Sequence, residues 1–174
     1  MPQDYHATVV RPIQRQELPL LLGLIGELAA FEHMADEVHV DEGKLAAALF
    51  APQPRVWALL AWQDEQAVGY AMLSEHFSSF AGCFGMYLED IYVRPQQRGA
   101  GVGHALLVHT ARFARTLGHE RLDFQVLDWN TSAQAFYERC GASPLRQWIP
   151  YRLDRAALEA LAKGRQGGST LHHE

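Results

Sequence analysis

One stretch, Leu88–Gly103, constrains the fold more than any other part of the chain; it reads LEDIYVRPQQRGAGVG. Residues 87–93 are apolar, aromatic or β-branched apart from two carboxylates, as in a central strand. Pro95 ends that strand because proline has no amide proton to donate. Glycines at 99, 101 and 103 then allow a tight turn into an amphipathic helix that we expect to reach Leu117. The stretch therefore predicts a strand, a turn and a helix at the centre of the fold.

This turn is suited to binding an anion. The N-terminus of a helix leaves amide groups without partners and carries a partial positive charge. Glycines keep side chains away from those amides, so a phosphate can approach them, and Arg98 adds a full charge. The Gly-Lys-Ser/Thr of a nucleotide P-loop is absent. A dinucleotide unit would need an acidic residue at the end of a second strand about 20 residues on, whereas Asp123 lies inside its strand.

The rest of the chain predicts further strands and helices around this unit. We expect strands at Thr8–Arg11, Val56–Trp62, Val68–Phe77, Arg121–Leu127 and Trp148–Leu153. We expect helices at Glu17–Phe31, Asp41–Phe50, Ser132–Cys140 and from Asp154 to Lys163. This order predicts a mixed sheet with helices on both faces, in one α/β domain over residues 1–164. Residues 165–174 have the composition of a mobile tail.

Composition excludes several classes of protein. The chain is 48% hydrophobic and 20% charged, which is ordinary for a globular domain. We expect no membrane span, because no apolar run is long enough, and we expect no signal peptide. The two cysteines give no disulfide framework, so we expect a cytoplasmic protein. The net charge of −5 argues against a nucleic-acid partner. Among nine histidines, His104 and His109 lie about 140° apart around a helix, so we expect no metal site.

The glycine turn from Arg98 to Gly103, joined to Leu88–Asp90 upstream and to Asn130 and Tyr137 downstream, resembles the Gcn5-related N-acetyltransferase (GNAT) superfamily. Within it, five segments resemble the diamine acetyltransferases that act on spermidine, spermine or thialysine. The segments are residues 11–12, 24–32, 87–90, 127–130 and 136–142, and the similarity extends over residues 8–162. The resemblance implies a mostly antiparallel sheet of about six or seven strands with helices on both faces. It also implies a splayed pair of parallel strands that hold acetyl-CoA, and a homodimer.

The resemblance implies specific cofactor contacts. The backbone at Ile91, Tyr92 and Val93 would hold the thioester and pantetheine end. The pyrophosphate would bind at Arg98, Gly99, Ala100, Gly101, Val102 and Gly103. By position alone Asn130 is a helix N-cap, and the resemblance implies that it also bonds the cofactor arm. By residue type alone Tyr137 is a core tyrosine, whereas the resemblance implies that it borders the cofactor and protonates the departing thiolate.

Two adjacent carboxylates, Glu89 and Asp90, stand in the central strand. In a regular strand they would point to opposite faces, and burying them without a use is costly. A primary amine with a pKa near 10.4 must lose a proton before it attacks a thioester. We therefore assign Glu89 as the base and Asp90 as the amine anchor, with exchanged roles left open. The alternative is a structural pair that bonds the backbone or Arg94.

An acidic segment gives a second indication of the substrate. Residues 27–43 carry six carboxylates and no Lys or Arg, which favours a cationic substrate, although a solvated surface explains the same composition. The resemblance places Phe31 and Glu32 at the amine. Phe31 stands where the spermidine enzymes have tyrosine, and the acidic pair those enzymes have near Trp148–Tyr151 is absent. A short diamine, thialysine or a lysine-like amine therefore fits at least as well as a long polyamine.

These observations predict an acetyl-CoA-dependent N-acetyltransferase that acts on a small cationic amine by direct transfer in a ternary complex. One alternative is acetylation of a protein N-terminus or lysine side chain. Another, from a different class, is a non-catalytic acyl-CoA-binding sensor module.

Overall fold

The computed structural model describes residues 7–164, which fall into two compact units. The first unit ends at Gln125 and the second begins at Val126. The predicted single domain over residues 1–164 stays a prediction, and the predicted tail at 165–174 lies outside the described residues.

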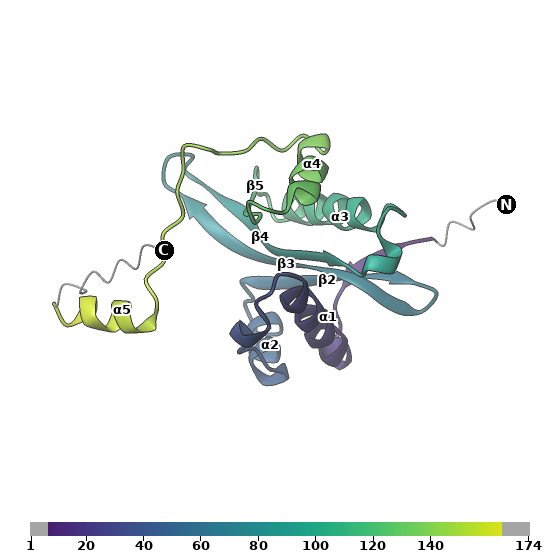
Figure 1. The fold of residues 1–174 in the computed structure, drawn as a ribbon, viewed down its shortest axis with the longest axis horizontal. Helices are drawn as coiled ribbons and strands as arrows, with labels where there is room; N and C mark the ends of the chain where they lie inside the picture. Colours follow the sequence, from purple (N-terminus) through teal and green to yellow (C-terminus); the bar gives the residue numbers. More distant parts are fainter. Residues whose placement is uncertain (1–6, 165–174) are drawn as a thin grey trace. The chain divides into compact units, whose positions relative to one another are not determined.

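The first unit is built on one five-stranded sheet in the order β1-β2-β3-β4-β5 (Figure 1). The strands are β1 (Val9–Pro12), β2 (Val56–Gln63), β3 (Gln66–Ser78), β4 (Cys83–Val93) and β5 (Leu122–Phe124). β1 to β4 pair antiparallel, and β5 pairs parallel to β4. The predicted mixed, mostly antiparallel sheet with one parallel pair is confirmed.

The described residues contain five strands, fewer than the six or seven expected. The stretch predicted as a strand at Trp148–Leu153 has no regular secondary structure, and most of its large side chains are exposed. The predicted fifth strand is shorter than expected, because its pairing with β4 ends at Phe124. Apolar alternation predicts an extended strand, but only a neighbouring strand can pair its amides.

Helices cover both faces of this sheet, as predicted. α1 (Leu18–Phe31) and α2 (Glu42–Leu49) lie on one face, and α3 (Val102–Thr116) lies on the other (Figure 1). Short 3₁₀ turns stand at Arg15–Glu17, Ala35–Glu37 and Pro95–Gln97. α1 buries Leu18, Leu21 and Leu24 against the sheet, at the three-residue spacing of one helical face.

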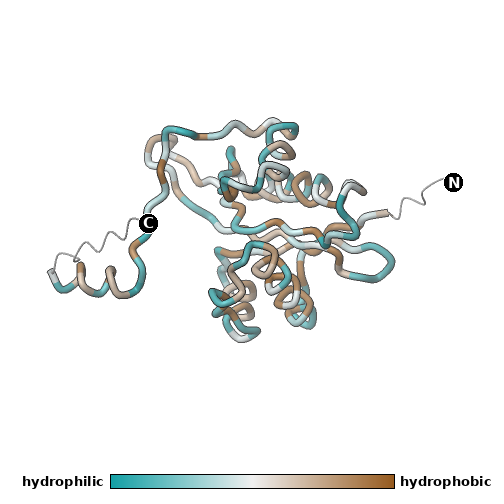
Figure 2. The backbone as a smooth tube through the Cα atoms, viewed as in Figure 1, coloured by the Kyte–Doolittle hydropathy of each residue, from teal (hydrophilic) through white to brown (hydrophobic). Residues whose placement is uncertain are grey.

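The hydrophobic core on the α1 side contains Leu60 and Tyr70 from neighbouring strands, both fully buried. On the opposite side, the ring of Trp57 in β2 meets that of Phe113 in α3 at 5.7 Å. Figure 2 shows hydrophobic residues along the sheet and α1, and hydrophilic ones at the β2–β3 turn. That turn places Asp64 and Glu65 at positive φ (46° and 63°), a conformation typical of a two-residue hairpin.

The second unit contains α4 (Thr131–Arg139) and α5 (Arg155–Ala162). Asn130 caps α4 by accepting a hydrogen bond from the Ala133 amide, and Asp154 caps α5 in the same way. Gly141 follows α4 with a φ of 93°, the left-handed conformation expected of a residue after a helix end. Within residues 7–164, no helix is long and apolar enough to cross a membrane.

Candidate active site

The glycine turn has the backbone geometry expected of an anion site. Gly99 and Gly101 adopt φ values of 81° and 83°, and Gly101 is the N-cap of α3. A Cβ added at either glycine would meet nothing within 4 Å, so glycine is needed for its conformation and the space beside it stays open. The first amides of α3 have no acceptor one turn earlier in the helix. They can therefore donate to a phosphate, and the turn fits the pyrophosphate of acetyl-CoA.

β4 and β5 separate beside this turn. Their pairing joins Met86–Leu88 to Leu122–Phe124, and β4 continues to Val93 beyond it. The amide of Arg94 donates to Val68 of β3 at 2.9 Å. Because strand amides alternate in direction, those of Ile91 and Val93 point away from β3, toward the side that β5 has left. These amides fit the predicted contacts with the thioester and pantetheine arm, and the splayed parallel pair follows the prediction.

Arg98 lies at the start of the turn with its side chain turned toward α1. Its Nε donates to the Val93 carbonyl at 2.9 Å. Its guanidinium lies 4.6 Å from the centre of the Phe31 ring and 5.7 Å from that of Tyr92. Arg98 therefore links the end of α1 to the glycine turn through cation–π contacts. Phe31 as an amine contact stays a prediction.

A β-bulge at Glu89 corrects the expected geometry of the two carboxylates. Met72 pairs with Asp90 and Leu73 pairs with Leu88, so Glu89 is an extra residue in β4. A bulge brings consecutive residues toward the same face. The side chain of Asp90 accepts from the Tyr70 hydroxyl at 3.2 Å, and that of Glu89 accepts from the Ser74 hydroxyl. Tyr70 and Ser74 share one face of β3, so Glu89 and Asp90 lie on that same face and not on opposite ones.

The bulge gives the two carboxylates different environments. Glu89 is exposed. Burial raises the pKa of Asp90, the hydrogen bond from Tyr70 lowers it, and the charge of Glu89 raises it further. Burial and the neighbouring Asp90 also raise the pKa of the Tyr70 hydroxyl, so it remains a donor. The alternative in which the pair bonds Arg94 does not apply, since Arg94 bonds Glu27 at 2.8 Å.

Asp90 and Glu32 line a small acidic pocket between α1, the following turn and the sheet, with a volume of about 160 Å³. Glu37 and Tyr70 add polar groups, and the other lining side chains are apolar, so that within residues 7–164 no Lys or Arg lines the pocket. Burial, and then the charge of Asp90, raise the pKa of Glu32. Two carboxylates that disfavour each other's ionisation are stabilised by a cation placed between them.

The acidic segment contributes less charge to this pocket than its composition indicated. Glu27 is paired with Arg94, and Asp41 caps α2 through the Lys44 amide. Among the segment's carboxylates, the pocket lining includes Glu32 and Glu37. Sequence reasoning missed Tyr70 and Ser74, because a tyrosine and a serine in an apolar strand are ordinary there.

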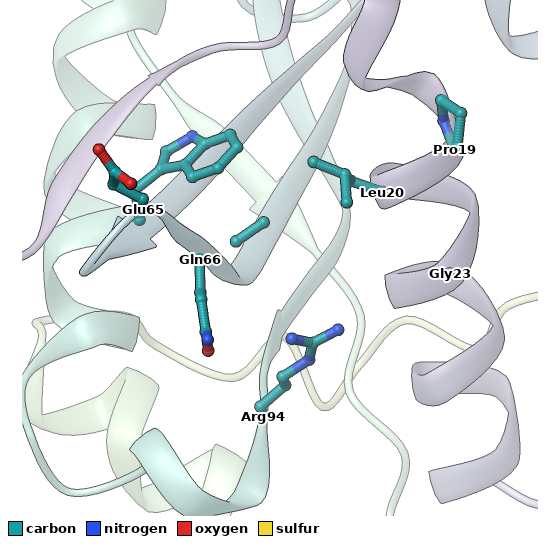
Figure 3. Close-up of a pocket in the computed structure, with 8 residues that line it drawn as sticks. Pro19, Leu20, Gly23, Glu65, Gln66 and Arg94 are labelled. Carbon is teal, nitrogen blue, oxygen red and sulfur yellow. The ribbon is translucent and has the colours of Figure 1, made fainter.

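A larger cavity of about 300 Å³ lies away from these carboxylates, beside the first turns of α1 and the β2–β3 hairpin (Figure 3). Leu20, Gln66 and Arg94 border it. Among the described residues its lining includes one carboxylate, Glu65 at the exposed hairpin turn, and the guanidinium of Arg94 is engaged by Glu27. The smaller, acidic pocket and the adjoining end of β4 are therefore the candidate active site.

Two predicted site residues belong to the second unit. Asn130 has the N-cap role that its position indicated, and Tyr137 is the buried residue of α4. Their predicted cofactor contacts stay predictions. Within residues 7–164, no group of three or more His, Cys, Asp or Glu side chains could hold a metal ion.

Comparison with known proteins agrees with this geometry. The acetyltransferase (GNAT) family profile matches residues 24–142. The thialysine N-ε-acetyltransferase of Bos taurus is 33% identical over 165 residues, covering 88% of this chain and 96% of that protein. The L-ornithine N5-acetyltransferase NATA1 of Arabidopsis thaliana is 37% identical over 100 residues, covering 58% of this chain and 44% of that protein.

Solved structures share the fold. An integron cassette protein from the mobile metagenome of V. cholerae superposes with a TM-score of 0.74 at 28% identity, covering 90% of this chain and 98% of that one. The glycine turn, the separating strands β4 and β5, and these similarities lead to one conclusion. The chain belongs to the acetyltransferase (GNAT) family and is an N-acetyltransferase that takes its acetyl group from acetyl-CoA.

Proposed function

We propose that the acceptor is the primary amine of a small cationic molecule, such as a diamine or a thialysine-like amine, and that transfer is direct in a ternary complex. The observation that carries this proposal is the acidic pocket. Glu32 and Asp90 both have raised pKa values, and among the described residues the pocket lining includes no cationic side chain. An ammonium group would relieve the unfavourable interaction between the two carboxylates. The relatives named for thialysine and ornithine acetylation support this class of substrate.

The carboxylates around the end of β4 have different roles in the reaction. Asp90 and Glu32 hold the incoming ammonium, and the exposed carboxylate of Glu89 accepts its proton directly or through water. Removing that proton at neutral pH costs about 4–5 kcal/mol, at about 1.36 kcal/mol per pH unit. The hydrogen bond from Ser74 orients Glu89. Acetyl-CoA, when bound, supplies the activated acetyl thioester.

The other predicted residues act on the cofactor side. The amides of Ile91 and Val93 donate hydrogen bonds to the thioester and pantetheine end, and the turn from Arg98 to Gly103 holds the pyrophosphate. Tyr137 donates a proton to the departing sulfur, and Asn130 bonds the cofactor arm. We also propose a homodimer, from the family resemblance alone.

The test is thiol release from acetyl-CoA with a panel of acceptors: putrescine, spermidine, spermine, thialysine, lysine and short peptides. Turnover with diamines or thialysine supports the proposal. Activity with peptides alone would move the acceptor to proteins, and acetyl-CoA binding without turnover on any acceptor would favour the sensor module.

Two variants separate the roles of the catalytic groups. Glu89→Gln should lower kcat most at low pH, where the amine carries its proton, with the acetyl-CoA affinity preserved. Tyr137→Phe should lower kcat with both substrates still bound. Unchanged turnover in either variant would remove the role assigned to that residue.

A further inference from the structure

A mixed-charge cluster lies along the sheet from the acidic pocket. It contains His76 of β3, Asp123 of β5 and Arg121 just before β5. The Nε of Arg121 lies 2.9 Å from Oδ2 of Asp123, and Nε2 of His76 lies 3.0 Å from the same oxygen. The three side chains keep between about a third and two fifths of their surface exposed. Oδ2 of Asp123 is buried and Nη2 of Arg121 lies 3.0 Å from Nε2 of His76, so these contacts hold a partly exposed guanidinium and a partly exposed carboxylate side by side.

The cluster is assembled over a glycine in the strand between its members. A Cβ added at Gly85 of β4 would lie 3.0 Å from Cγ of Arg121 and 3.1 Å from Nε2 of His76. Side chains from the two neighbouring strands therefore meet above β4, in the space that Gly85 leaves empty. That space exists because position 85 carries no side chain.

The cluster and the amine-binding carboxylates occupy the same face of the sheet. β3 is regular beside the bulge, so Tyr70, Ser74 and His76 share one face. Glu75, between the last two, points to the opposite face and lies 3.1 Å from His119. Tyr70 contacts Asp90, Ser74 contacts Glu89, and His76 contacts Asp123. One face of β3 therefore contacts both the carboxylates at the pocket and the cluster.

Tyr87 connects the two charged regions. It pairs with Ser74 on one side and with Asp123 on the other. Burial, and then the charges of Glu89 and Asp123, raise its pKa. Tyr87 therefore stands between the carboxylate assigned as base and the cluster, and its ring meets that of His76 at 6.2 Å.

The spacing matches a particular class of acceptor. Ser74 and His76 are two residues apart, or about 7 Å along the strand at about 3.4 Å per residue. An extended lysine-like side chain spans roughly 6 Å between its terminal nitrogen and its α-carbon, given bond lengths near 1.5 Å. An amine whose nitrogen reaches Glu89, the carboxylate bonded by Ser74, would therefore place its other end at the cluster.

Resting on the proposed function, we propose that this cluster is a subsite for the head group of an α-amino acid, so that among small cationic amines the enzyme prefers a basic amino acid to a diamine or polyamine. Arg121 binds the α-carboxylate, to which its planar guanidinium is suited. Asp123 accepts from the α-ammonium. A diamine would bring a second cation to Arg121 with no carboxylate to compensate it.

The experiment compares acceptors that differ by a single carboxylate: lysine with cadaverine, and ornithine with putrescine. We expect the wild-type enzyme to favour the amino acid in each pair by tenfold or more in kcat/KM. Arg121→Gln should lose roughly tenfold to a hundredfold on the amino acids, as expected for a hydrogen bond to a charged group, with under threefold change on the diamines. Arg112→Gln, an exposed arginine on α3, is the matched control and should behave as wild type.

A measurement on the unmodified enzyme tests the subsite without depending on whether the variant folds. Lysinamide keeps both amines of lysine and lacks the carboxylate, so it should be acetylated at least tenfold less efficiently than lysine. Equal use of lysine and lysinamide, or equal losses on both members of each pair in Arg121→Gln, would overturn the subsite while leaving the proposed function intact. Absence of turnover with all small amines would overturn the proposed function and the subsite together.

Discussion

Substitution of Gly101 tests the phosphate-binding turn most directly, because three residue types separate conformation from charge. Gly101 has a φ of 83° and a ψ of 0°, and a Cβ there would meet nothing within 4 Å. Gly101→Ala therefore adds no clash, and its effect is the left-handed backbone alone, about 1–2 kcal/mol of unfolding free energy. Asn and Asp tolerate this conformation better than Ala, and they are nearly equal in size.

The difference between Gly101→Asn and Gly101→Asp then isolates charge at the anion site. A carboxylate about 4 Å from one phosphate charge is repelled by about 1 kcal/mol in bulk water and about 4 kcal/mol at an effective dielectric constant of 20. Gly101→Asp should therefore bind acetyl-CoA between about fivefold and several hundredfold more weakly than Gly101→Asn. Added salt should narrow the gap, because it screens exposed charges.

The assay is isothermal titration of acetyl-CoA into each variant at low and high salt, with thermal unfolding in parallel. At the N-terminus of α3 an aspartate should stabilise the helix slightly relative to asparagine. Relative to Gly101→Asn, Gly101→Asp should therefore bind acetyl-CoA more weakly and unfold at a slightly higher temperature. Such a result excludes misfolding as the cause of weak binding. Equal acetyl-CoA affinities for the Asn and Asp variants would refute the phosphate-binding role of this turn.

Three other predictions follow from the described contacts. Glu65→Gly should raise the unfolding free energy by about 1 kcal/mol and leave kcat unchanged, because it relieves a positive φ in the β2–β3 turn; an unchanged or lower thermal midpoint would contradict this. Tyr70→Phe removes the hydrogen bond that lowers the pKa of Asp90, so the acidic limb of the pH profile of kcat/KM should move to higher pH. The value of kcat/KM at neutral pH should fall by roughly tenfold to a hundredfold. A pH profile that overlays that of the wild type would show that Asp90 does not hold the amine. Burial raises the pKa of Asp90 above its ordinary 3.8, so the folded state binds this proton more tightly and loses stability as the pH rises from 3.8 through the pKa in the folded state. Asp90→Asn should therefore resist urea better than wild type at pH 7, and this advantage should vanish as the pH falls toward 3.8. A constant difference in urea resistance across that pH range would count against the raised pKa of Asp90.

The sequence by itself determined the central unit of the fold. Pro95 and the glycines at 99 and 101 act through local backbone chemistry, so the end of β4 and the start of α3 could be located without a structure. The helix caps at Asp154 and Asn130 were predictable for the same reason, because a cap depends on residues three positions apart. The family resemblance likewise rests on local segments, among them the glycine turn and Asn130.

Only the tertiary structure decided which face the catalytic carboxylates occupy. A bulge is a mismatch between two strands, so nothing in the β4 sequence alone shows that Glu89 is the extra residue or that Asp90 meets Tyr70. The strand predicted at Trp148–Leu153 is rich in aromatic and aliphatic side chains, yet it has no paired neighbour in the described residues. Pairing depends on residues far apart in the chain, and the composition of one segment describes only one of the two partners.

Charge compensation was likewise a tertiary outcome. Glu27 and Glu32 stand five residues apart in the same helical region and are equivalent in composition. The fold brings Arg94 to Glu27 and brings Asp90 to Glu32, so one carboxylate is neutralised and the other is left to attract a cation. The sequence supplied the acidic side chains, and the packing of α1 against the end of β4 decided which of them form the site.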